Sequence, residues 1–495
     1  MSRAGLPIET LPAWALLNDV AFVDIKVVNT EEKGYGVVCE KNLSTKQDTS
    51  DSPTLLTAPH SLVLNAEAVQ EYAKEDKSFR QLLNAVGHHS ARRDILLFLL
   101  VQMVLASRPS QPPVGVSNPW TEYLKFLTKE ALVPTLWTEE ERLLLRGTSL
   151  NTAVNAKISA LDVEFDAVRE PSSDIPCWND MFWTSGAISF RDWILLDALY
   201  RSRCLELPRS GESLVPCIDM INHSSNPTAY YDENSKDEAV LLLRPGIDIA
   251  EGDEVTISYG DTKSAAEMLF SYGFIDPTST AESLALPLDA FPDDPLARAK
   301  LVLFGEAPKV HVARDHGSIT WRSPFAYLMC VNEEDGLEFR VLQDTEGARQ
   351  LRVFWQDEDV TDQKADFETL IRAHPLAAIL RLRVVTVVQE CLQAQLDKLR
   401  GSALDSTIAA TNPSLLREDC AKAALLLRQV EASILETGVE ALEKEASHNS
   451  HIIRLLLQRC SLLADEDVVA YLGSMETAEL DIANEEASNE AEDFS

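Results

Sequence analysis

The 495-residue chain carries 44 Lys and Arg against 79 Asp and Glu, which gives a net charge of −35 at neutral pH. Hydrophobic residues make up 45% and charged residues 25%, as is typical of a globular protein long enough for two or three domains. The negative charge disfavours a nucleic-acid partner and would suit a basic protein substrate, although a charge of this kind also serves solubility alone.

Cysteine usage and hydropathy limit the cellular compartments in which we expect the protein. The eight cysteines are scattered without a Cys-x-x-Cys pair, which indicates reduced thiols inside a cell and argues against a zinc cluster. The longest apolar run, 95–105, is broken by Gln102 and is too short to cross a membrane, and no signal peptide is recognisable. We therefore expect a cytoplasmic or nuclear protein that binds no metal, no membrane and no nucleic acid.

Short β elements open the chain. Apolar residues alternate over 20–28, and Lys33-Gly34-Tyr35-Gly36 forms a turn that leads into a second strand ending near Cys39. Segment 54–64 continues a small sheet. Gly-x-Gly at this position is typical of a hairpin turn, and it lacks the third glycine and the helix of a dinucleotide fingerprint.

A helical region follows. Apolar residues at three-to-four spacing predict helices near 66–86, 91–106, 119–128, 138–146, 150–168 and 190–200, with Pro-rich breaks such as 107–113. Four residues around the third helix are predicted to belong to the core and to carry no chemistry: Trp120, Tyr123, Leu124 and Leu127. The last helix ends in Arg201-Ser202-Arg203, and the residues alone are equally compatible with a solvated helix face.

A polar cluster then follows an apolar run. Residues 214–218 lead into Asp219-Met220-Ile221-Asn222-His223-Ser224, and Asn226-Pro227 ends the element. This pattern predicts a buried strand or short helix that delivers polar groups to one point. A single His on an apolar element is more often a core residue than a ligand or base, so this stretch alone decides nothing.

A second stretch, over 255–274, makes it possible to interpret the stretch over 214–227. Alternation at Val255, Ile257 and Tyr259 predicts a strand that ends at Gly260. Met268 and Tyr272 then share helical spacing, so a short helix returns a second tyrosine toward the first. The order Asp-Met-x-Asn-His-Ser, Tyr-Gly and Tyr-Gly-Phe resembles the C-terminal half of a SET domain. It is most similar to the class of the Rubisco large-subunit lysine methyltransferase and its non-histone relatives.

The resemblance implies an α+β fold. A SET domain of small β-sheets with a threaded crossing would cover 1–275, with a helical insertion at about 66–200. A mostly helical substrate-binding lobe over 285–473 would follow, where strand-like patterns near 285–360 give way to amphipathic helices over 366–472. The acidic stretch 474–495 is predicted to be a disordered tail.

The resemblance also implies a reaction: methyl transfer from S-adenosyl-L-methionine to the lysine ε-amine of a basic, non-histone protein, by a monomeric enzyme. Tyr259 would be the catalytic tyrosine, and Tyr272 would line the lysine channel. Arg203, or failing that Arg201, would pair with the cofactor carboxylate, because a guanidinium suits bidentate pairing. Further cofactor contacts are expected, besides Tyr259 itself, from Lys33, Gly34, Tyr35, Asp219, Met220, Ile221, Asn222, His223, Gly273 and Phe274.

Methyl transfer to an amine depends on alignment and on a deprotonated nucleophile. Desolvation beside a positive sulfonium lowers the pKa of a lysine, so no dedicated side-chain base is required. Ala265 departs from the class, which commonly has Asn there, and the absence of a Cys-rich segment after Phe274 favours a non-histone substrate. Two alternatives stay open: a protein-histidine methyltransferase, and a catalytically inactive SET-type interaction module.

Overall fold

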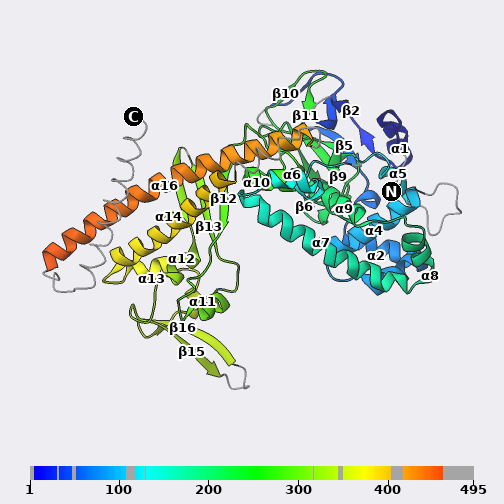
Figure 1. The fold of residues 1–495 in the computed structure, drawn as a ribbon. Helices are drawn as coiled ribbons and strands as arrows, with labels where there is room; N and C mark the ends of the chain where they lie inside the picture. The colour runs from blue at the N-terminus through cyan, green and yellow to red at the C-terminus, as the bar shows by residue number, and fades with distance from the viewer. Residues whose placement is uncertain are drawn as a thin grey trace, which may run out of the picture. The chain divides into compact units, whose positions relative to one another are not determined.

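The fold was obtained as a computed structural model (Figure 1). It describes residues 5–30, 33–46, 52–107, 118–128, 130–315, 317–343, 349–402 and 416–460, with side chains to 448. The chain forms two compact units: Met1–Ala281 with Ser402–Arg428, and Glu282–Gly401 with Gln429–Ser495. The tail predicted over 474–495 lies outside the described residues.

Small antiparallel sheets form the β part of the first unit. Their strands are β1 (Ala21–Phe22), β2 (Ile25–Thr30), β3 (Gly34–Cys39), β4 (Leu43–Ser44), β5 (Thr54–Ala58), β6 (Leu205–Leu207), β7 (Gly211–Ser213), β8 (Ala229–Glu233), β9 (Ala239–Leu243), β10 (Asp248–Ile249) and β11 (Glu254–Val255). The sheet orders are β1-β5-β9-β8, β11-β3-β2, β10-β4 and β6-β7. Three of these sheets join strands from before and after the helical region, so the two ends of the unit's sequence close on each other.

Between these strands the chain is helical, as predicted. The elements are α2 (Ala66–Glu75), α3 (Lys77–Val86), α4 (Ala91–Ala106), α5 (Pro119–Tyr123), α6 (Glu139–Leu143), α7 (Ser149–Ser173), α8 (Pro176–Trp178) and α9 (Phe190–Arg203). The helix expected over 66–86 is two helices, because Asp76 leaves helical geometry and caps α3 with its carboxylate. α4 is apolar on all sides and is buried on all sides, which places it at the centre of this layer.

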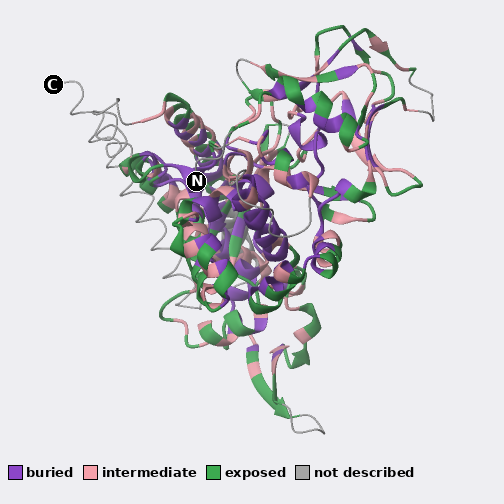
Figure 2. Cartoon of the chain, turned by 90° about the vertical axis from the view of Figure 1, so that its right-hand side faces the viewer, coloured by how far each residue is buried: buried purple, intermediate pink, exposed green. Residues whose placement is uncertain are grey.

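Short elements complete the unit. They are η1 (Ile8–Thr10), α1 (Leu11–Leu17), η2 (His60–Leu62), η3 (Pro134–Leu136), the π-helix η4 (Asn179–Thr184), η5 (Ile218–Met220) and α10 (Ala265–Tyr272). Figure 2 shows how buried residues gather where helices and strands face one another. α9 matters most for the site, since it packs on α4 and α7 and ends at Arg203.

The second unit combines two three-stranded sheets with helices. The sheets are β12 (Glu282–Pro287), β13 (Lys309–Asp315) and β14 (Ser318–Arg322), and β15 (Leu337–Gln343), β16 (Arg349–Trp355) and β17 (Glu358–Asp359). The helices are α11 (Ala297–Phe304), α12 (Pro324–Met329), η6 (Thr361–Gln363), α13 (Phe367–Arg372) and α14 (Ala377–Gly401), with the later part of α16 (Glu418–Cys460). Leu382, Val385 and Val388 of α14 are fully buried, which explains why apolar residues recur at a spacing of three in this amphipathic segment.

One segment groups differently from the sequence expectation. The sequence predicts that residues 416–428 belong to the C-terminal lobe, yet they group with the first compact unit. Arg417 donates hydrogen bonds to both carboxylate oxygens of Glu141, at 2.8 and 2.7 Å, and Leu427 packs in an apolar cluster with Trp137. Contacts between residues so distant in sequence leave no periodic signal in the chain.

Candidate active site

The two motif stretches lie side by side. His223 and Ile257 form a parallel bridge, in which the Ile257 amide donates to the Asn222 carbonyl at 3.0 Å and the Ser224 amide donates to the Ile257 carbonyl at 3.1 Å. The strand predicted through Tyr259 is therefore shorter than expected. Regular pairing with β3 stops at Val255, because Thr256 bonds to Thr228 and Ala229, and Ile257 bonds to the Asn-His turn.

A cavity of about 210 Å³ opens at this junction. Five predicted site residues line it: Arg203, Asp219, Ile221, Tyr259 and Tyr272. The remaining lining comes from residues that the motifs did not single out: Ser202, Cys204, Leu205, Ile218, Tyr231, Ile257, Ser258, Gly260 and Asp261.

Tyr259 presents its hydroxyl oxygen as an acceptor. The hydroxyl donates to the Ile221 carbonyl at 2.8 Å, so its proton is engaged and its free lone pair is available to an N–H group in the cavity. Burial raises the pKa of Tyr259 well above its ordinary range, which keeps the phenol neutral. The group can therefore orient an amine but cannot act as a phenolate base at neutral pH.

His223 supports the backbone of Tyr259. Its Nδ1 accepts the Tyr259 amide proton at 3.1 Å, and its Nε2 lies 3.4 Å from the Asp276 carboxylate. Burial lowers the pKa of His223, which favours the neutral ring with its proton on Nε2. Ser225 donates to Asp276 at 2.5 Å, so this carboxylate is itself held in place. Sequence reasoning missed Asp276, although it follows Phe274 by two residues.

Aromatic rings surround Tyr259. Its ring centroid lies 4.5 Å from that of Tyr272, whose hydroxyl donates to the Tyr259 carbonyl at 3.2 Å, and Phe274 lies 6.4 Å from both rings. Gly273 ends α10 at φ +85°, where a Cβ would lie 2.8 Å from the backbone of Leu132, so only glycine fits. Burial raises the pKa of Tyr272 to about 12, which leaves a second neutral phenol beside the first.

Ala265 does not disturb this arrangement through the helix cap. Ser264 accepts the Glu267 amide at 3.3 Å, and the Glu267 carboxylate accepts the Ser264 amide at 2.8 Å. This capping box is complete without an asparagine at position 265. Ala265 itself packs against an apolar cluster of the first unit.

The two arginines at the end of α9 have different surroundings. Arg201 donates to Asp197 at 2.8 Å, to Thr135 at 3.0 Å and to the Phe270 carbonyl, so its guanidinium is fully engaged in packing. Arg203 lines the cavity and donates through Nη1 to the Asp219 carbonyl at 2.6 Å. Its buried Nε has no hydrogen-bond partner among the described residues. Of the two, only Arg203 can offer a donor to a ligand.

The N-terminal glycine turn meets the Asn-His turn, but outside the cavity lining. Asn222 donates to the Tyr35 carbonyl at 3.2 Å and to Glu254 at 2.7 Å, and Lys33 pairs with Glu254 at 2.9 Å. A Cβ on Gly36 would lie 2.8 Å from the Asn222 amide nitrogen, so glycine permits this close approach. The predicted residues that do not line the cavity are Lys33, Gly34, Tyr35, Met220, Asn222, His223, Gly273 and Phe274. Their cofactor contacts stay predictions.

Comparison with known proteins shows which fold carries this geometry. No family model matches the chain. The chain is 29% identical to SET domain-containing protein 8 of Schizosaccharomyces pombe over 381 residues, which cover 75% of this chain and 82% of that protein. A crystal structure of the SET domain of LSMT bound to lysine and AdoHcy superposes with a TM-score of 0.66 at 18% identity, over 94% of this chain and 98% of that one. The chain therefore has the fold of that SET domain.

Further relatives of the chain are named as enzymes. It is 24% identical to the ribulose-1,5-bisphosphate carboxylase/oxygenase large subunit N-methyltransferase of Nicotiana tabacum, over 60% of this chain and 56% of that protein. It is 22% identical to the actin-histidine N-methyltransferase of Gallus gallus, over 65% of this chain and 52% of that protein. The chain therefore spans about half the length of these two relatives. The resemblance to the Rubisco methyltransferase class and the predicted α+β SET fold are confirmed.

Proposed function

We propose that this SET-domain protein transfers a methyl group from S-adenosylmethionine to the lysine ε-amine of a non-histone protein. One observation carries the proposal. The pairing of the Asn222–Ser224 turn with Ile257 brings Tyr259, Tyr272 and Arg203 around a single cavity. The relatives named as lysine and histidine N-methyltransferases support the same reaction class.

The cavity fits a zwitterionic methyl donor. Arg203 has a buried Nε without a partner among the described residues, and a carboxylate is the group that would satisfy it. The nearby side-chain oxygen of Asp219, Oδ2, likewise lacks a hydrogen-bond donor. S-adenosylmethionine, when bound, supplies an electrophilic methyl group on a positively charged sulfonium.

The residues of the chain then orient the acceptor. The Tyr259 oxygen accepts a hydrogen bond from an N–H of the incoming amine, which turns the nitrogen lone pair away from the phenol and into the cavity. Tyr272 packs against the Tyr259 ring and narrows the approach, so that water is excluded and the amine is held neutral. Alignment and desolvation provide the catalysis.

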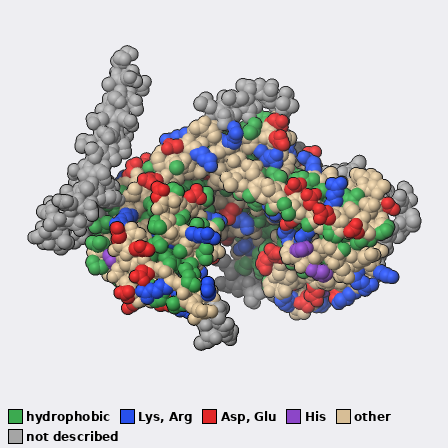
Figure 3. Space-filling model, turned by 60° about the horizontal axis from the view of Figure 1, so that its bottom comes forward, with side chains coloured by type: hydrophobic (Ala, Val, Ile, Leu, Met, Phe, Trp, Pro, Cys, Tyr) green, Lys and Arg blue, Asp and Glu red, His purple; other side chains and the backbone are tan. Residues whose placement is uncertain are grey.

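The charge of the chain favours a basic partner. Asp261 contributes a carboxylate to the cavity lining, where it attracts an approaching ammonium group. On the face drawn in Figure 3, Asp and Glu side chains are interspersed with Lys and Arg, so the attraction comes from net charge and not from one acidic patch on that face. We propose a monomeric enzyme, and a nucleic-acid partner stays disfavoured by the net charge of −35.

The proposed location is the cytoplasm or the nucleus. The seven cysteines whose side chains the structure describes are free, which suits a reducing compartment. Within the described ranges, no helix is long and apolar enough to cross a membrane. In the same part of the chain, no cluster of three His, Cys, Asp or Glu side chains could hold a metal ion.

The direct test is Tyr259→Phe, assayed with labelled cofactor and a cell extract, with Tyr72→Phe as the control for a buried phenol away from the cavity. We expect turnover to fall by roughly 10²-fold or more, as when a positioned proton-transfer or orienting group is removed. Cofactor affinity, measured by calorimetry, should stay nearly unchanged. Methyl transfer by the Phe variant at the parent rate would sink the assignment.

Two other outcomes would redirect the proposal. Mass spectrometry of the labelled products reports the acceptor residue, and a modified imidazole would support the histidine alternative that the actin-histidine relative suggests. A folded chain without measurable cofactor affinity would support the inactive interaction module instead.

A further inference from the structure

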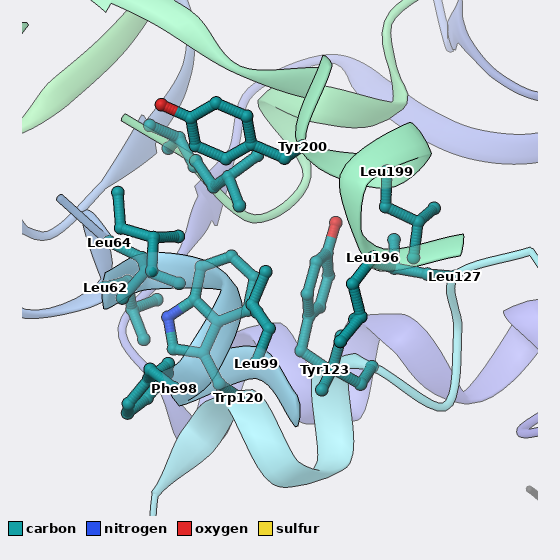
Figure 4. Packing of buried hydrophobic residues seen from close by; sticks show 14 of the residues in the cluster. Leu62, Leu64, Phe98, Leu99, Trp120, Tyr123, Leu127, Leu196, Leu199 and Tyr200 are labelled. Atoms are coloured by element: carbon teal, nitrogen blue, oxygen red, sulfur yellow. The ribbon is translucent and has the colours of Figure 1, made fainter. Parts of the chain in front are cut away.

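A tyrosine of the helical insertion reaches the cavity wall from outside. Tyr123 on α5 is fully buried, with its ring packed against Trp14 and Trp120 at centroid distances of 4.9 and 5.4 Å. In Figure 4 the ring stands beside Leu196 of α9 with its hydroxyl pointing away from α5. Sequence reasoning assigned Tyr123 to the core, where a phenylalanine would pack equally well, so the hydroxyl needs a separate explanation.

The hydroxyl binds both ends of one turn. It accepts the Cys217 amide proton at 2.8 Å and donates its own proton to Oδ1 of Asp219. Cys217 is fully buried with φ +72° and ψ −35°, a conformation that strains a non-glycine residue unless its surroundings enforce it. The Tyr123 hydroxyl is the side-chain group that receives this amide, so it stabilises the strained residue directly.

Beyond this turn lies the ligand-facing arginine. Arg203 donates through Nη1 to the Asp219 carbonyl at 2.6 Å, and the same nitrogen lies 3.5 Å from Oδ2 of Asp219. The turn thus holds one end of the guanidinium. Its Nε keeps no partner among the described residues, although Arg203 lines the cavity. A change in the Cys217–Asp219 turn would therefore change where Nε points.

We propose that Tyr123 is a positioning residue for the methyl donor: its hydroxyl holds the Cys217–Asp219 turn, and the turn aims Arg203 at the donor's carboxylate. This inference rests on the proposed function. It assigns to the helical insertion a part in cofactor binding, through a contact between residues 96 positions apart in the chain. Tyr123 does not line the cavity, so it acts only through Asp219 and Arg203.

The test is Tyr123→Phe, which keeps the packed ring and removes only the hydroxyl. We expect the Kd for S-adenosylmethionine to rise by roughly tenfold, the effect of losing one hydrogen bond to a charged group. The KM for the donor should rise in parallel, while kcat at saturating donor changes little. Tyr200→Phe is the matched control, because it removes a phenol of α9 that bonds to Glu212 instead.

A donor analogue without the carboxylate distinguishes a changed orientation of Arg203 from a general loss of order in the cavity. Decarboxylated S-adenosylmethionine cannot pair with Arg203, so the parent and Tyr123→Phe should bind it with equal affinity. An equal loss of affinity for both ligands would overturn the inference, as would unchanged affinity for S-adenosylmethionine. A parent protein that binds neither ligand would instead refute the proposed function, so the two failures are distinguishable.

A second variant guards against poor folding. Adding Cys217→Gly to Tyr123→Phe removes the strain at φ +72°, since glycine adopts this conformation freely. We expect the double variant to regain affinity for S-adenosylmethionine relative to Tyr123→Phe, and Cys217→Ala in the same background to regain none. Equal behaviour of the glycine and alanine variants would contradict a role for the turn.

Discussion

Two buried carboxylates of the first unit each lie beside an arginine at the end of α9, yet they differ in what else surrounds them. Asp197 receives Arg92 at 2.5 Å, Lys157 at 2.9 Å and Arg201 at 2.8 Å. Burial alone would raise the pKa of Asp197, but these three cations hold it below the ordinary value. Among the described residues, Arg203 is the one cation paired with Asp219, at 3.5 Å; Tyr123 donates to the carboxylate, and burial raises its pKa.

The difference separates a structural cluster from a binding site. The three cations around Asp197 engage both of its carboxylate oxygens. The cluster therefore links α4, α7 and α9 and leaves neither oxygen of Asp197 unpaired for a ligand. Around Asp219, one carboxylate oxygen and the Arg203 Nε are buried without a hydrogen-bond partner among the described residues. Incomplete pairing beside a cavity indicates that a ligand completes it.

The largest effect on stability is expected from a substitution at Asp197. Asp197→Ala leaves buried cations without their counter-ion, and we expect the free energy of unfolding to fall by about 3–5 kcal/mol. Denaturant unfolding measures this loss. Cofactor affinity of the remaining folded protein should not change, because Asp197 does not line the cavity. A variant of parental stability would show that the cluster does not hold the helices.

Glu141 tests whether a second saturated carboxylate behaves like Asp197. Although burial opposes the shift, hydrogen bonds from Arg417 and from the Thr138 amide lower the pKa of Glu141 to about 2, from its usual 4.5. Arg417→Met should reduce the free energy of unfolding by about 2 kcal/mol, as expected for hydrogen bonds to a charged group. Cofactor affinity is the control and should not change.

The same pair predicts an acid dependence. Because the folded pKa of Glu141 is lowered, its contribution is complete above the ordinary pKa of 4.5 and is lost as the pH falls toward 2. Unfolding curves of the parent between these pH values should therefore lose stability more steeply than those of Arg417→Met. Identical slopes would mean that Arg417 is not the source of the shift.

Substitutions of Arg203 and Arg201 test which of the two arginines contributes to cofactor affinity. Arg203→Lys removes the free Nε donor, and we expect cofactor affinity to fall by roughly tenfold, or about 1.4 kcal/mol. Arg201→Lys should leave this affinity unchanged and lower the melting temperature instead, since Arg201 bonds to Asp197 and Thr135. Calorimetry and thermal unfolding of both variants give the answer. The reverse pattern would exchange the two assignments.

The smallest expected effect concerns pH and His223. Protonation at Nδ1 would remove the acceptor of the Tyr259 amide, so kcat should stay level at neutral pH and decline only below the ordinary histidine pKa of about 6.5. Burial lowers the pKa of His223, while Asp276 and Asp261 oppose the shift. Asp276→Asn removes one of these charges and should move the decline to still lower pH. A shift to higher pH would contradict the Asp276 contact.

Patterns among residues that are close in sequence predicted most elements of the first unit. Ser264 and Glu267 lie three residues apart, and the apolar residues of α4 are contiguous, so both helices follow from neighbouring residues. The motif order around His223 and Tyr259 was enough to identify the SET fold. These signals depend on residues close in sequence, or on a known pattern, and so they are readable without coordinates.

Tertiary structure alone determines the different surroundings of Arg201 and Arg203, the hydroxyl contact of Tyr123 and the early end of the strand at Val255. Each depends on hydrogen bonds between groups distant in the chain, such as Tyr123 with Asp219 or Ile257 with Asn222. Side-chain type and periodicity are the same whether a donor is saturated or free. Only the folded arrangement determines which buried polar atoms find partners, and it is this arrangement that distinguishes a packing residue from one that can bind a ligand.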